Sequence, residues 1–79
     1  MTSYRVRLEG PAAVTLSVAT ALADADGVEL ISSAQPVTVN EGVLALEVTV
    51  EGAFDAVADA VASIRDSLPT GASIEITGR

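Results

Sequence analysis

The residues of this chain that could do chemistry are its carboxylates and its arginines. Among 79 residues there are 11 Asp and Glu and four Arg, with no Lys, no His and no Cys. Without an imidazole or a thiol, the chain can build neither a Ser-His-Asp or Cys-His nucleophile nor a zinc site with Cys and His ligands. We therefore expect no enzyme activity, no catalytic residue and no cofactor.

Two pairs of carboxylates are spaced closely enough to hold a cation. Asp24 and Asp26 are close in sequence, and Asp55 and Asp59 share one face of a predicted helix. Carboxylate oxygens are ligands that hard cations prefer, but neither run resembles a calcium-binding loop. Asp55 also lies in the first helical turn, where the helix dipole favours negative charge. We expect these side chains to keep the protein soluble, and we expect no metal site.

Two arginines lie on the face of the predicted sheet that no helix covers. Arg5 and Arg7 alternate with apolar residues in the first strand, and the neighbouring strands carry Glu47 and Glu75 on the same face. One interpretation is a solvated ladder of salt bridges, each contributing about 0.2–1 kcal/mol. The other is a polar platform for a partner or for an anionic ligand held by the two arginines.

The net charge of −7 bears on partners and on location. An acidic surface repels phosphate backbones, so we expect no nucleic-acid partner. No apolar run reaches the length of a membrane span, and the N-terminus lacks an apolar stretch of signal-peptide length. We therefore expect a cytoplasmic protein that does not bind membranes. The acidic, lysine-free composition suits a salt-rich cytoplasm, and the codon bias of a GC-rich genome explains it equally well.

Two similar halves predict the fold. Val6-Arg7-Leu8-Glu9-Gly10 precedes one Ala-rich helical stretch, and Val48-Thr49-Val50-Glu51-Gly52 precedes another. Each stretch leads into a further strand, which is typical of a repeated strand–helix–strand unit. We expect strands at 4–9, 28–33 (resuming at 37–39), 43–51 and 72–76, and helices at 11–25 and 53–68. This order predicts an α+β, ferredoxin-like βαββαβ sandwich, a single domain over 1–79, with a four-stranded antiparallel sheet and two helices on one face.

The pattern also indicates which residues face the core. The second strand is expected at an edge and bent near Pro36, because proline cannot donate to a β-ladder. The third strand is expected to point Leu44, Leu46, Val48 and Val50 inward and Ala45, Glu47, Thr49 and Glu51 outward. The buried stripes of the helices are expected to be Val14, Val18, Ala21, Leu22 and Ala25 in the first and Phe54, Val57, Val61, Ile64 and Leu68 in the second.

The first helix lacks the charged residues that a surface helix in so acidic a protein ought to carry. From Gly10 to Ala23 no residue is charged. Small, neutral outer residues indicate a surface that something covers, and chance in an Ala-rich sequence is the alternative. Because open sheet edges tend to pair, we expect a homodimer formed through this helix and the second strand. Its interface residues are expected to be Thr15, Leu16, Ala19 and Ile31.

The loop after the first strand resembles the start of an ACT domain. The resemblance rests on Glu9-Gly10-Pro11-Ala12-Ala13-Val14, followed by the run from Ala21 to Leu30, and the related NIL-type modules are similar. It implies a regulatory domain that binds an amino acid or a similar small molecule, usually between paired copies. The ligand would lie at Glu9, Gly10, Pro11, Ala12 and Ala13, although the family's glycine after the proline is Ala12 here. The alternative is a stand-alone structural or protein-interaction module with a protein partner and no small ligand.

Overall fold

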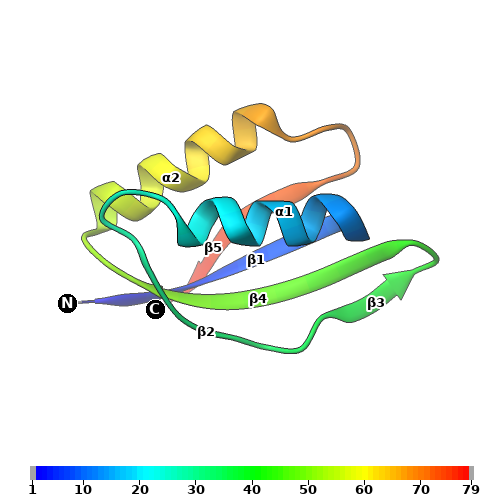
Figure 1. Cartoon of the computed structure of the whole chain (residues 1–79), viewed down its shortest axis with the longest axis horizontal. Helices are drawn as coiled ribbons and strands as arrows, with labels where there is room; N and C mark the ends of the chain where they lie inside the picture. Colours follow the sequence, from blue (N-terminus) through cyan, green and yellow to red (C-terminus); the bar gives the residue numbers. More distant parts are fainter. Residues whose placement is uncertain (1, 79) are drawn as a thin grey trace.

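The computed structural model describes residues 2–78, and Met1 and Arg79 lie outside the described residues. The chain folds into two layers, with a five-stranded antiparallel sheet covered on one face by two helices (Figure 1). The α+β class expected from the sequence is therefore confirmed. The elements are β1 (Ser3–Pro11), α1 (Ala12–Ala23), β2 (Glu29–Ser33), β3 (Val37–Asn40), β4 (Val43–Glu51), α2 (Phe54–Ser67) and β5 (Ser73–Gly78).

The sheet has five strands where four were expected, because the edge opposite β5 is interrupted. The strand order is β2-β4-β1-β5, and β3 pairs with β4 beyond the end of β2. The chain leaves the ladder at Ala34–Pro36, where Pro36 has no N–H to donate, although the Ala34 N–H still reaches the Glu47 carbonyl oxygen at 2.9 Å. The edge position of Pro36 agrees with the sequence analysis, and β1 and β4 are the two central strands.

The core lies between the sheet and the helices, and the alternation of β4 fixes one side of it. Leu46, Val48 and Val50 are buried as expected, and Leu44 is half-buried. Ala45 was expected outside and is only 8% exposed, because Val37 of β3 lies directly opposite it. The rest of the core comes from both helices, from β1 and β5 and from the residue before β2: Tyr4, Val6, Leu8, Val18, Leu22, Val28, Val57, Val61 and Ile74.

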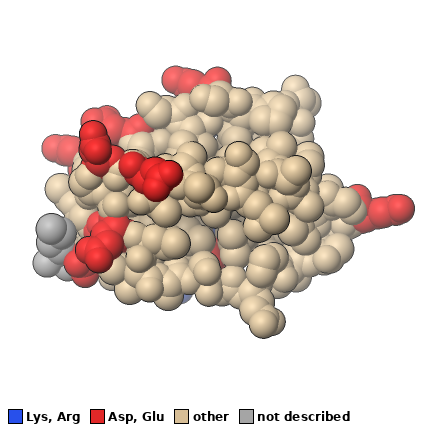
Figure 2. Space-filling model, in the orientation of Figure 1, with Lys and Arg blue, Asp and Glu red and all other residues tan. Residues whose placement is uncertain are grey.

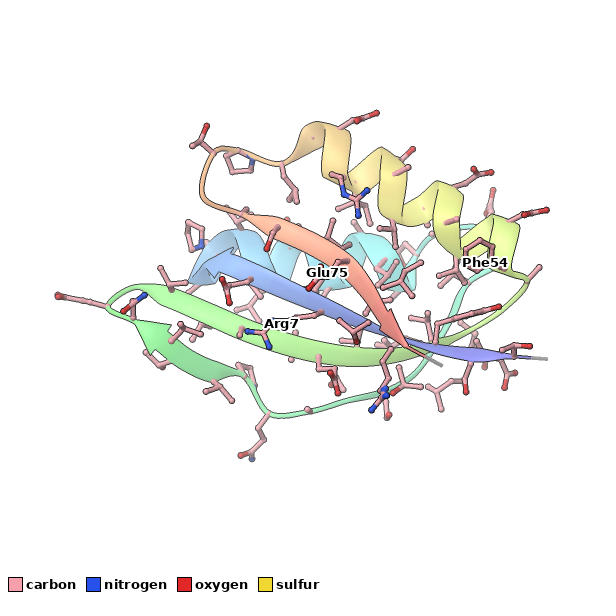
Figure 3. All side chains as sticks on the ribbon, turned by 180° about the vertical axis from the view of Figure 1, so that it is seen from behind. Arg7, Phe54 and Glu75 are labelled. Atoms are coloured by element: carbon pink, nitrogen blue, oxygen red, sulfur yellow. The ribbon has the colours of Figure 1, made fainter. Side chains whose placement is uncertain are left out.

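Three helical residues are placed differently from the expected stripes. Thr15, expected on the outside, is buried at 2% exposure, whereas Ala21, expected inside, is exposed. Phe54 is 55% exposed and begins α2, where its ring lies against that of Tyr4 with 5.6 Å between centroids (Figure 3). Spacing alone put Phe54 in the buried stripe. The actual stripe of α2 is centred on Val57 and Val61, which turns the first residue toward the end of the sheet.

None of the helices in the described residues is long and apolar enough to cross a membrane.

Candidate functional site

The open face of the sheet carries the charged side chains expected there, but they do not form a continuous ladder. The register puts Arg7 opposite Glu47 on β4 and opposite Glu75 on β5 (Figure 3). Within residues 2–78, however, the one ion pair formed joins Arg7 Nη2 to Glu9 Oε1 of its own strand, at 3.0 Å. An anion at Arg7 would therefore meet a guanidinium already paired with a carboxylate, which argues against an anion site centred on Arg7.

The predicted loop Glu9–Ala13 consists of the last three residues of β1 and the first two residues of α1, so the strand runs directly into the helix. The backbone polar groups of this segment are largely used within the chain. The Thr15 hydroxyl donates to the Gly10 carbonyl oxygen at 3.1 Å, and the Ala12 N–H donates to the Gly42 carbonyl oxygen at 3.2 Å. Beneath the loop, the void beside Leu8 and Ala72 has no space for a water molecule. Within one copy, the void beneath this segment is too small for a ligand.

The expected interface residues divide into two groups. Leu16 and Ile31 are exposed at 53% and 50%, and Ala19 is half-buried against the core. The expectation that Thr15 faces outward is wrong, because its hydroxyl turns back to Gly10 and its methyl group is buried. Thr15 therefore offers no side-chain surface to a second chain.

A groove of about 400 Å³ runs between α1 and the open edge of the sheet, and we call it the edge groove. Leu16 and Ala19, two of the expected interface residues, lie in the wall formed by α1. Leu30 lies in the wall formed by β2. Ile31 is next to Leu30 in β2, where the register with β4 shifts. The complete lining is Leu16, Ala19, Thr20, Ala23, Leu30, Ser33, Ala34, Pro36, Leu46 and Val48.

A second groove of about 400 Å³, which we call the inter-helix groove, lies on the other flank of α1. The wall from α1 consists of Ala13, Val14, Ser17, Val18 and Ala21. The opposite wall consists of Ile64, Ser67, Leu68 and Pro69, from the end of α2 and the residues after it. Sequence reasoning missed this groove. The available signal was that Ser17, Ala21 and Ser67 are too short to fill the space between two helices.

Neither groove is lined by a charged residue. In the view that faces α1, carboxylates gather toward the ends and rim of the molecule, and the middle is almost entirely uncharged (Figure 2). Helix α1 is thus a ridge between two uncharged grooves on a chain whose net charge is −7. No three carboxylates of the described residues come together to hold a metal ion.

No protein-family model matches the sequence, and no curated protein matches it. What the chain does has to be argued from the geometry of α1 and its two grooves.

Proposed function

We propose that this chain is a non-catalytic regulatory module of the ferredoxin-like, ACT-like kind, which works as a homodimer and senses a small molecule. In this proposal β2 and β3 together count as one interrupted edge strand. The observation that carries the proposal is the uncharged surface formed by α1 and the edge groove beside an open sheet edge.

The charge distribution favours this surface for self-association. Two copies of net charge −7 repel each other wherever their carboxylates meet, so an uncharged face is the surface on which they approach at least cost. All five residues of β2 are exposed, and the outer side of an edge strand offers free N–H and C=O groups for pairing. A chain of only 79 residues builds a small core, so it also gains stability from a partner.

The dimer is tested by placing a charge on the ridge. Leu16→Asp would bury an unpaired carboxylate in the interface, and we expect it to weaken dimerisation at least tenfold in sedimentation or light scattering. Ala62→Asp is the matched control, since Ala62 is exposed on α2 and lines neither groove. A parent chain that stays monomeric at high protein concentration and moderate salt would refute the proposal.

A second candidate is a protein-interaction module with no small ligand. It is favoured by the loop Glu9–Ala13, where the Gly10 carbonyl oxygen and the Ala12 N–H already have partners within the chain. A thermal-shift screen against amino acids and nucleotides separates the two candidates. A ligand at 100 times its dissociation constant stabilises the folded state by about 2.7 kcal/mol, and a flat screen with an intact dimer would favour the interaction module.

A further inference from the structure

The inter-helix groove has the size and the composition of a small-molecule site. Its volume of about 400 Å³ lies within the range of ligand pockets, which are mostly apolar with a few polar groups. The polar side chains in its walls are the hydroxyls of Ser17 and Ser67. The groove shares no lining residue with the edge groove, where the dimer interface is proposed.

The groove is held open by the packing of the two helices on the sheet. Val18 and Leu22 fix α1, and Val57 and Val61 fix α2, all four within the core cluster. Three of the positions where the helices face each other, Ser17, Ala21 and Ser67, hold short side chains, which leave space between the two helices. Below the groove the core is filled, because the void under Val14 and Val18 has no room for water.

The electrostatics of the groove select an uncharged occupant. An anion would enter a chain of net charge −7 without meeting a cation in the lining. Arg65 of α2 does not line the groove, and its guanidinium donates to the Ile74 carbonyl oxygen of β5 at 2.9 Å. A cation would lose hydration without a carboxylate in the lining. Past Ala21 and Ile64 the space between the helices continues, but there Asp26 and Asp59 line it, which sets a polar boundary to the apolar site.

We propose that the inter-helix groove binds a small, uncharged, apolar molecule, with its hydrocarbon part against Val14, Val18 and Leu68 and any hydroxyl or carbonyl near Ser17 or Ser67. This site lies outside the loop Glu9–Ala13 except for Ala13, and on the opposite flank of α1 from the edge groove.

The test uses N-phenyl-1-naphthylamine, a neutral apolar probe whose fluorescence rises in apolar surroundings. We expect saturable binding of one probe per chain, displaced by 1-octanol and at least tenfold less well by octanoate. Ser17→Phe fills the groove and should weaken probe binding at least tenfold. Ala62→Phe adds the same ring to an exposed position of α2 outside the groove and should change the affinity less than twofold. Amide shifts on binding should fall within 13–21 and 64–68.

The outcomes separate this site from the proposed dimer. Leu16→Asp should lose the dimer and keep the probe, since Leu16 does not line the inter-helix groove. Three outcomes would each refute the site without bearing on the dimer. They are absence of saturable binding, equal affinity in the parent and in Ser17→Phe, and equal displacement by octanoate and octanol. A monomeric parent that binds the probe would overturn the dimer and uphold the site.

Discussion

Gly10 and Gly52 end the two central strands in nearly the same backbone conformation, with φ of +157° and +159°. Each packs against the loop that precedes an outer strand. A Cβ on Gly10 would lie 2.9 Å from the Cβ of Ala72, and a Cβ on Gly52 would collide with the carbonyl oxygen of Gly27. The repeated Glu-Gly of the sequence therefore has the same structural role in both halves. At each glycine the neighbouring loop is so close that only a hydrogen atom fits in place of a side chain.

Gly52→Ala should destabilise the fold by about 3 kcal/mol, because a backbone carbonyl cannot move aside as the end of a side chain can. Gly42→Ala is the control. Gly42 has φ +78° and open space around it, so alanine there should cost about 1–2 kcal/mol from the left-handed conformation alone. Urea unfolding measures both. A loss for Gly52→Ala no larger than that for Gly42→Ala would contradict the contact with Gly27.

Among the elements, β4 has the most neighbours in the sheet, since it pairs with β1 on one side and with β2 and β3 on the other. Its register with β1 runs without a break from Ser3 opposite Glu51 to Pro11 opposite Val43. Its inward side chains Leu46, Val48 and Val50 belong to the core cluster between the sheet and the helices. The two edge ladders are shorter and shifted, at Leu30/Ser32 and at Thr38/Asn40. The stability of the sheet should therefore depend more on β4 than on β2 or β3.

Leu46→Ala should lower the free energy of unfolding by about 2–5 kcal/mol, through lost burial and the cavity left behind. Leu46 is buried in the core, whereas Val37 on the edge strand β3 is among the most exposed apolar residues. Val37→Ala should accordingly cost less than about 1 kcal/mol. Both losses are read from chemical denaturation at matched protein concentration. If Leu46→Ala cost under about 1 kcal/mol, the central place of β4 would be wrong.

The elements were predictable where the alternation of apolar and polar residues was long and unbroken. The alternation from Val43 to Glu51 predicted β4 with its observed bounds, and Pro36 predicted the interrupted edge. Positions at the border of a helical stripe were not predictable, because a rotation of α1 by a fraction of a turn exchanges Thr15 for Ala21 without changing the spacing. Thr15 turns inward because its hydroxyl has an acceptor at Gly10, a contact that only the folded loop supplies. The inter-helix groove depends on the distance between two helices, which no local pattern encodes.

At the scale of the whole molecule, charge opposes the compact state. The net charge is −7, and one close approach of like charges is built into the sheet, where Glu29 of β2 lies directly opposite Glu51 of β4. Like charges in directly opposed cross-strand positions destabilise a sheet. The acidic surface thus lowers the stability of the fold, and dissolved salt should offset part of that cost by screening.

The melting temperature should rise as salt is raised from low to molar concentration. Glu29→Gln should add about 0.5 kcal/mol at low salt by relieving the pair with Glu51, and its melting temperature should depend less on salt. Glu41→Gln removes the same charge from an exposed turn and should leave the salt dependence close to that of the parent. A melting temperature that does not change with salt would remove the salt-adaptation hypothesis and leave codon bias to explain the composition.

The position of β1 in the sheet has a consequence for how the protein is made. Of the five strands described, β1 is synthesised first, but its ladder partners are β4 and β5, which end at Glu51 and Gly78. Its hydrogen bonds therefore wait for most of the chain to be synthesised, and the second of its two ladders waits for the last strand. The short β3–β4 hairpin, closed at 40–43, is the pairing that can form locally. Sheets whose central pair is so distant in sequence fold more slowly than helical bundles of the same size, and during that delay the apolar side chains of β1 are exposed to any chaperone that recognises extended segments.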